Sequence, residues 1–220
     1  VIGTLCIMKR EPADPEAFDL APLLDLAAIA TDEIELWKLN RELRRKAEID
    51  PLTGLPNRRS FEEALQSAVA RTNRIGEPVS LLLLDADRFK LVNDLSGHQT
   101  GDAVLIRVAN VLAEAPRRPL DSIARHGGEE FAIVLPDTDS AGAEAVAQSI
   151  LTRLRGEAIA HPAGGIVSVS IGGATLQGPG VTLEELFRTA DAALYDAKRG
   201  GRDTLPQSRG GVSGRFRPGP

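Results

Sequence analysis

Two short acidic segments hold the side chains of this sequence that are best suited to bind a metal ion. The first is the turn Gly127-Gly128-Glu129-Glu130, which lies between two apolar runs rich in β-branched residues. Such runs on either side of Gly-Gly predict a β-hairpin, and the glycines leave its backbone open to a bulky ligand. Adjacent carboxylates at the tip repel each other unless a cation or a ligand proton relieves them. The alternative is a solvated turn without a ligand.

The second acidic segment, Asp85-Ala86-Asp87, follows the apolar run 80–84. A continuous apolar run of this length is typical of a central strand that is buried on both faces. Asp85 and Asp87 point the same way if the strand continues through them. Asp85 and Glu129 would then hold Mg²⁺, which favours one or two carboxylates together with substrate phosphates. The alternative is that Asp85 caps the strand and Asp87 is solvated.

The order of the expected elements predicts how these two segments meet. We expect strands over 79–86, 121–126, 130–135 and 166–175, and helices over 100–114, 140–155 and 182–198. The last helix begins at a capping box, Thr182 to Glu185. The order strand, helix, strand, strand, helix, strand predicts an α+β, ferredoxin-like (palm or nucleotidyl cyclase-like) fold, in which a central antiparallel sheet is flanked by helices. The first and third elements lie close in such a sheet, which brings Asp85 toward Glu129.

At this level of detail the sequence resembles the GGDEF domains, the diguanylate cyclases, in their GGEEF variant. The resemblance covers about residues 50–205. Six blocks match the family in order: 50–59, 85–94, 97–102, the signature 127–131, 168–172 and 195–202. Such enzymes join two GTP molecules into cyclic di-GMP and release two pyrophosphates, so the resemblance implies the same reaction here.

The resemblance also implies a metal centre. By position, Asp85 and Glu129 bind the metal ions, assisted by the carbonyl of Ala86, while Glu130 and Asp87 complete the acidic surroundings. Mg²⁺ is the expected cofactor, and Mn²⁺ is possible. One ion lowers the pKa of the attacking ribose 3′-hydroxyl, and the other steadies the pyrophosphate leaving group. Glu129, Glu130 and Asp85 are therefore the expected catalytic residues.

A second set of residues matches the family's substrate-binding positions. Asn93 and Asp102 match the family positions that read guanine. A carboxylate suits guanine because it accepts hydrogen bonds from the N1–H and 2-amino groups, and adenine offers no such pair of donors. The alternative for Asp102 is an acid that interacts with a helix dipole. The remaining expected groups neutralise or cradle phosphate, or leave room for it: the side chains of Lys90, Lys198 and Arg202, the backbone of Arg88 and Phe89, and the glycines Gly127 and Gly128. The alternative for Lys198 is a basic helix C-terminus, and Asp203 departs from the Asn that is usual in the family.

Arg118-Pro119-Leu120-Asp121 matches the RxxD motif that lies five residues before the signature. In the family this motif is the inhibitory site for the product cyclic di-GMP. Arg offers a fork for phosphate or for the guanine Hoogsteen edge, and Asp accepts from guanine donors. The alternative is a surface ion pair.

Four segments divide the chain. Residues 1–35 resemble the C-terminal fragment of a GAF-like sensory domain, with a strand over Val1–Met8. Residues 22–49 predict a linker or signalling helix, in which Leu36, Leu39 and Leu43 have coiled-coil spacing. The cyclase domain covers 50–205, and residues 206–220 predict a disordered tail. We expect a homodimer, because each domain binds one GTP while the product needs two.

Composition bounds the remaining possibilities. The net charge of −5 gives no sign of nucleic-acid binding, and the single Cys6 excludes an internal disulfide. The single cysteine is consistent with a reducing cytosol, so we expect a cytoplasmic protein. No apolar stretch is long enough to span a bilayer, so we expect no membrane segment in this chain. The absence of an initiating Met suggests an excised fragment. Two other functions stay open. One is a silent domain that only binds GTP or cyclic di-GMP as a receptor, and the other is a related nucleotidyl transferase that uses ATP.

Overall fold

The computed structural model describes residues 21–115 and 118–200. The chain divides into two compact units, Val1–Ala47 and Glu48–Pro220. In the first unit the helix α1 (Ala21–Glu48) confirms the helix expected over 22–49. The strand predicted at Val1–Met8, the predicted tail 206–220 and Arg202 lie outside the described residues. Within the described ranges, every helix is too short or too polar to cross a membrane.

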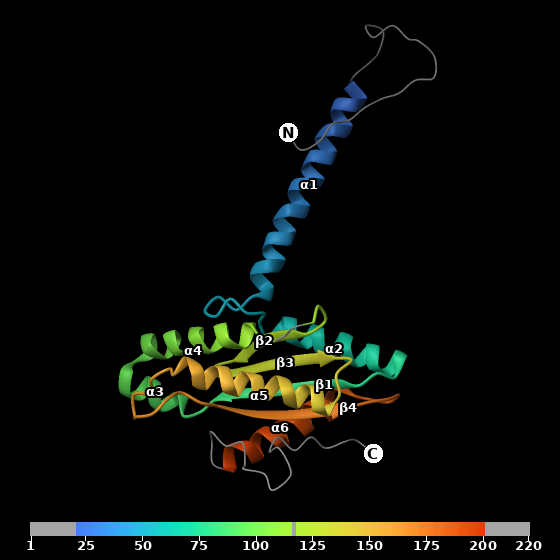
Figure 1. Ribbon diagram of the computed structural model, residues 1–220. Helices are drawn as coiled ribbons and strands as arrows, with labels where there is room; N and C mark the ends of the chain where they lie inside the picture. The colour runs from blue at the N-terminus through green and yellow to red at the C-terminus, as the bar shows by residue number, and fades with distance from the viewer. Residues whose placement is uncertain (1–20, 116–117, 201–220) are drawn as a thin grey trace. The chain divides into compact units, whose positions relative to one another are not determined.

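The second unit is built on one antiparallel sheet of four strands (Figure 1). The strands are ordered β2-β3-β1-β4 across the sheet, which confirms the ferredoxin-like arrangement. Every residue of β1 is buried, as the apolar run predicted, because this strand lies between two neighbours and beneath helices on both faces. The strand bounds are β1 (Val79–Ala86), β2 (Ser122–Gly127), β3 (Glu130–Pro136) and β4 (Val169–Leu176).

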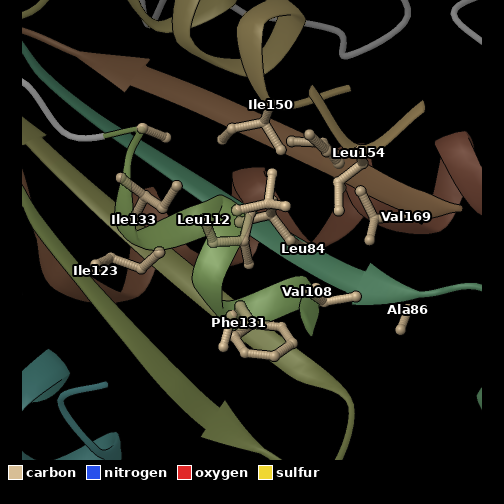
Figure 2. Packing of buried hydrophobic residues seen from close by; sticks show 14 of the residues in the cluster. Leu84, Ala86, Val108, Leu112, Ile123, Phe131, Ile133, Ile150, Leu154 and Val169 are labelled. Atoms are coloured by element: carbon tan, nitrogen blue, oxygen red, sulfur yellow. The ribbon is translucent and has the colours of Figure 1, made fainter. Parts of the chain in front are cut away.

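Helices cover both faces of the sheet, and alternate residues of β1 serve the two layers. Leu82 and Leu84 pack in the cluster that includes α4 and α5, whereas Leu81 and Leu83 pack in the cluster that includes α2 and α6. Figure 2 shows the first cluster, with Leu84 among residues from β3, α4 and α5. The helix bounds are α2 (Arg58–Ile75), α3 (Phe89–Ser96), α4 (His98–Ala113), α5 (Ser140–Glu157) and α6 (Leu183–Arg199).

The helices α2 and α3 were not predicted from the sequence. The helix α2 is capped by Asn57, whose side chain accepts a hydrogen bond from the Ser60 N–H. It buries the stripe Phe61, Leu65, Ala68, Val69 and Thr72. The short helix α3 follows Arg88, which has left-handed backbone angles with φ of 55°. The strand predicted over 166–175 begins only at Val169, because Ile166 instead bridges to Ala160.

A glycine allows α6 to approach the sheet closely. A Cβ at Gly172 of β4 would lie 2.1 Å from the backbone nitrogen of Leu194 in α6, so no side chain fits there. The capping box predicted at the start of α6 is present in part, since Thr182 Oγ1 accepts from the Glu185 N–H at 3.2 Å. This close packing carries the far end of α6, with Lys198, to the edge of the sheet where β1 ends.

Candidate functional site

The pairing of β1 with β3 brings the two acidic segments together, as predicted. Asp85 lies opposite Glu130 in the register, and the Ala86 N–H donates to the Glu129 carbonyl at 3.2 Å. The hairpin is also confirmed: Gly127 pairs with Glu130 across the turn, and Gly128 has a φ of 52°. The Asp85 side chain is 12% exposed and that of Glu130 is 52% exposed, so the two acids differ greatly in solvation.

Lys198 supplies a cation to this acidic edge. Its Nζ lies 2.7 Å from Asp85 Oδ2, where α6 ends against β1. Burial raises the pKa of the Asp85 carboxyl above its ordinary value, and the nearby Glu129 and Glu130 raise it further, against the opposing effect of Lys198. A poorly solvated carboxylate beside two other acids is stabilised by a cation. The position of the Lys198 ammonium shows where a cation can lie against Asp85.

The donor set around Asp85 fits a magnesium ion. Mg²⁺ uses oxygen ligands and keeps only one or two protein carboxylates, with phosphate and water oxygens in the other positions. Asp85, Glu129 and the Ala86 carbonyl offer oxygens of this kind at one end of β1. No three carboxylate, His or Cys side chains converge as a complete cage within the described part of the chain. Water or phosphate oxygens would therefore have to fill the remaining positions.

Asp87 is neither aligned with Asp85 nor exposed to solvent. The strand ends at Ala86, so the alternation that would align Asp87 with Asp85 does not continue. Asp87 is 5% exposed, which rules out the solvated alternative, and its carboxylate accepts hydrogen bonds from Ser168 and Ser170, each at 2.6 Å. The Asp87 N–H also donates to the Ser168 carbonyl at 2.9 Å. These bonds fasten the segment after β1 to the start of β4.

The residues predicted to read guanine lie on neighbouring helices. Asn93 is half-buried in α3, and Asp102 is exposed in α4. Asp102 lies beyond the first turn of α4, which contains no acidic residue. Because the dipole interaction falls off within the first turn, it explains little of the role of Asp102.

The predicted phosphate-binding residues lie around the start of α3 and the end of α6. Arg88 and Lys90 are exposed, Phe89 is buried, and Lys198 is half-buried. The first N–H groups of a helix have no partner within the helix, so the beginning of α3 suits an anion. Gly127 and Gly128 are both exposed at the hairpin tip, where a Cβ on either would meet nothing within 4 Å.

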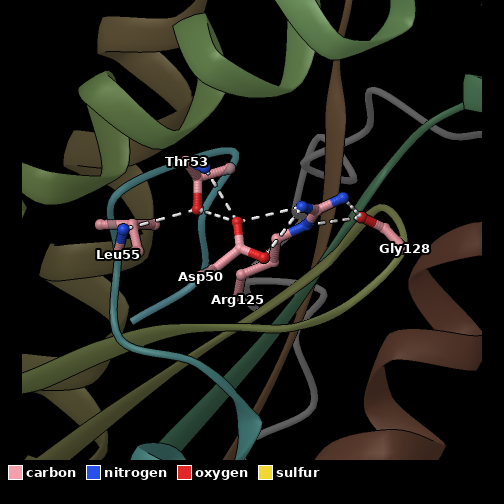
Figure 3. A network of polar contacts seen from close by, with 5 residues as sticks. All are labelled: Asp50, Thr53, Leu55, Arg125 and Gly128. Atoms are coloured by element: carbon pink, nitrogen blue, oxygen red, sulfur yellow. Dashed lines mark hydrogen bonds and ion pairs between the residues drawn. The ribbon is translucent and has the colours of Figure 1, made fainter. Parts of the chain in front are cut away.

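An arginine that the sequence analysis did not single out holds the hairpin tip. Arg125 donates from Nε and Nη2 to the Gly128 carbonyl, at 2.9 and 2.8 Å, and from Nη1 to both oxygens of Asp50, at 3.0 and 3.1 Å (Figure 3). Asp50 also accepts from the N–H and hydroxyl of Thr53, at 2.9 and 2.7 Å. Burial opposes ionisation of Asp50, but its bonds from Thr53 and Arg125 outweigh burial and hold its pKa below the ordinary value. The segment just after α1 is thereby tied to the turn that carries Glu129.

The neighbouring His126 supports the same turn from the opposite layer. Its ring packs edge-on against Phe61 of α2, with centroids 5.3 Å apart, and lies 5.7 Å from the ring of Phe187 in α6. Its Nδ1 is 3.6 Å from Glu130 Oε2, an ion pair when the imidazole is protonated. The sequence signal for His126 is its place directly before Gly127.

The RxxD segment lies away from the acidic edge and lines a cavity of about 250 Å³. Both Arg118 and Asp121 contribute to its wall, together with residues of α5. The Arg118 N–H donates to Asp121 Oδ2 at 3.1 Å, and the Asp121 N–H donates to the Arg118 carbonyl at 3.0 Å, so the motif forms a compact turn. Arg118 Nη1 donates to the Asp137 carbonyl and to Thr138 Oγ1, at 3.1 Å each.

Comparison with known proteins relates this geometry to one family. Residues 47–204 match the family described as "Diguanylate cyclase, GGDEF domain". The chain is 37% identical over 214 residues to the response regulator PleD of Caulobacter vibrioides, an alignment that covers 93% of this chain and 45% of PleD. It is 45% identical over 167 residues to the diguanylate cyclase DgcP of Pseudomonas aeruginosa, covering 74% of this chain and 24% of DgcP. The chain therefore spans less than half the length of either relative.

A solved structure agrees with the fold. The crystal structure of the coiled coil and GGDEF domain of DgcB from Caulobacter crescentus, in complex with c-di-GMP, superposes with a TM-score of 0.74 at 34% sequence identity. The match covers 82% of this chain and 96% of that one.

The Arg125 contacts lead to a prediction about stability. Arg125→Ala removes the partner of Asp50 and of the Gly128 carbonyl, so we expect the free energy of unfolding to fall by about 1–3 kcal/mol near neutral pH. The folded-state pKa of Asp50 lies below 3.8, so its ionic contribution is full above that pH and is lost as the pH falls through the folded pKa. The difference between wild type and variant, measured by urea unfolding, should therefore shrink below about pH 4.

A matched control is Arg59→Ala, which breaks only the exposed pair of Arg59 with Glu63. We expect this change to cost less than about 0.5 kcal/mol. Equal losses in the two variants would show that the Arg125 network contributes nothing beyond an ordinary surface contact.

Proposed function

The chain belongs to the GGDEF family, and we propose that it is a diguanylate cyclase that condenses two GTP molecules into cyclic di-GMP with release of two pyrophosphates. The observation that carries this proposal is the convergence of Asp85 and Glu129 through the β1–β3 pairing, beside an exposed Gly-Gly tip. A domain that acted only as a receptor would have no need for acids at an edge where burial and the neighbouring glutamates disfavour the charge of Asp85.

Asp85, Glu129 and the Ala86 carbonyl are the groups that would hold Mg²⁺ or Mn²⁺. When bound, the metal supplies charge for the attacking 3′-oxygen and for the pyrophosphate that leaves the α-phosphorus. Glu130 keeps the surroundings acidic at the exposed side of the tip. Lys198 bonds to Asp85 in the structure, and in the proposed complex its ammonium turns to the triphosphate.

The base and the phosphates have separate binding groups. Asp102 accepts from the guanine N1–H and 2-amino groups, and the amide of Asn93 both donates and accepts on the same base. Lys90, Arg202 and the backbone N–H groups of Arg88 and Phe89 bind the phosphates, with Gly127 and Gly128 leaving space for their approach. The exposed position of Asp102 in the second turn of α4 supports this assignment over a dipole role.

We infer that the active species is a homodimer, because two GTP molecules must face each other for each 3′-hydroxyl to reach the other α-phosphorus. The apolar side chains of α1 support a helix pairing, since Ile29, Leu36 and Leu39 are 60%, 60% and 55% exposed. Replacing Leu36 and Leu39 with glutamate should yield a folded monomer without turnover, as measured by light scattering and product assay. Full activity in a proven monomer would contradict the dimer.

We also infer that cyclic di-GMP inhibits the enzyme through Arg118 and Asp121. The support is the shared cavity of about 250 Å³, which one positive and one negative side chain line together. A guanidinium fork suits a phosphate or a guanine edge, and a carboxylate suits the guanine N1–H and 2-amino donors.

The reaction itself is tested with GTP and Mg²⁺, with the products separated by chromatography. Glu129→Ala should lower the rate of cyclic di-GMP formation at least about a thousandfold while leaving the unfolding transition unchanged. The exposed Glu62→Gln in α2 is the control and should keep the wild-type rate. Tight GTP binding without any product from the wild-type chain, also at high protein concentration, would favour the receptor function instead.

Feedback is tested by adding cyclic di-GMP to the same assay. Arg118→Ala should keep the uninhibited rate and raise the half-inhibitory concentration at least about tenfold, because the fork that holds the ligand is lost. Arg107→Ala removes a comparable exposed arginine, paired with Glu157, and should change neither quantity. An unchanged inhibition curve for Arg118→Ala would show that the RxxD segment is a structural turn without a role in inhibition.

A further inference from the structure

Gly101 of α4 lies directly beneath the amide of Asn93. A Cβ built on Gly101 would lie 2.0 Å from Asn93 Oδ1, 3.1 Å from Asn93 Cγ and 3.1 Å from Cζ of Phe89. Gly101 is buried although it is inside a helix, where glycine is the least favourable residue other than proline. The position therefore carries a conformational cost, and the close contact between α3 and α4 accounts for it.

The nature of the contact decides what a side chain here would disturb. The nearest atom is the free end of an asparagine side chain, which can rotate away at little cost to the fold. Among the residues that the structure describes, no group hydrogen-bonds the Asn93 amide and holds it in place. At Gly172 the corresponding neighbour is the backbone nitrogen of Leu194, which cannot move without α6. A methyl group at 101 would thus displace the Asn93 amide and leave the helices together.

We propose that Gly101 is a positioning residue for guanine recognition: its missing side chain is the space that the Asn93 amide occupies when it faces the base. This inference rests on the proposed role of Asn93 as a guanine-reading residue. It assigns nucleotide selectivity to a residue that does not itself touch the nucleotide. Gly101→Ala should therefore affect stability and nucleotide binding in opposite directions. Alanine is the better helix former at 101, and yet its side chain displaces the Asn93 amide from the site.

The experiment measures equilibrium binding of the α,β-methylene analogue of GTP, which cannot be condensed because its Pα–C bond does not break. Gly101→Ala should weaken this binding about five- to tenfold, the range expected for loss of a hydrogen-bonded contact to the base, with a thermal midpoint equal to or above that of wild type. The corresponding ATP analogue should bind equally weakly to both proteins, so that the GTP preference falls by the same factor.

Two further variants form a double-mutant cycle with Gly101→Ala. Asn93→Ala alone should weaken binding to a similar degree, and the Asn93→Ala/Gly101→Ala double variant should be no weaker than Asn93→Ala. The control is Gly156→Ala in α5, where a Cβ meets nothing within 4 Å; it should raise the thermal midpoint and leave binding unchanged.

The outcomes separate this inference from the function on which it rests. Wild-type binding in Asn93→Ala would overturn the guanine-reading role of Asn93. Loss in Asn93→Ala with wild-type binding in Gly101→Ala, or additive losses in the double variant, would overturn the positioning role of Gly101 alone. Should Gly101→Ala fail to fold, a folded double variant would still support the clash with Asn93, and an unfolded one would contradict it.

Discussion

Asp85 is the penultimate residue of β1, the most deeply buried strand of the sheet, and lies beside two further acids. Its side chain is 12% exposed, and its neighbours across the β1–β3 pairing are Glu129 and Glu130. Water cannot fully solvate the carboxylate there, and burial together with the two glutamates raises its pKa. The rest of the site can be understood as the means of supplying positive charge to that one position. Lys198 does so in the protein alone, and a divalent metal with nucleotide phosphates does so in the proposed complex.

Three features away from the acids hold this arrangement in place. The absence of a side chain at Gly172 lets α6 lie against β4, which carries Lys198 to Asp85. Arg125 fixes the Gly128 carbonyl and so the turn that presents Glu129. Asp87, buried and bonded to two serines, fastens the segment that leads into α3. Each feature removes freedom from a group that the proposed reaction needs in a fixed position.

Much of this could be read from the sequence because the signals are local. The apolar run before Asp85 predicted a buried central strand, and the Gly-Gly pair predicted the hairpin that carries Glu129. The order of elements then predicted their meeting. The helix α2 was missed although its buried stripe from Phe61 to Thr72 has helical spacing, and α3 was missed because it begins at the unusual backbone of Arg88 and is short.

The contacts that could not be predicted join residues far apart in the chain. Nothing near Asp50 indicates that it pairs with Arg125, and nothing near Asp87 indicates that Ser168 and Ser170 donate to it. The setting of Lys198 against Asp85 and the fit of the Asn93 amide above Gly101 likewise depend on how helices pack. The buried run and the Gly-Gly turn therefore predicted Asp85 and Glu129, and the family resemblance implied the other candidate site residues, whereas only the packed structure reveals what holds them.

The most direct test of the central claim is a crystal structure of the chain with Mn²⁺ and the α,β-methylene analogue of GTP, with the metal located by its anomalous scattering. We expect manganese bound by Asp85 and Glu129, with the Lys198 ammonium moved from Asp85 Oδ2 to the phosphates. Manganese elsewhere, or a nucleotide bound with Lys198 still paired to Asp85 and no metal between the acids, would contradict it.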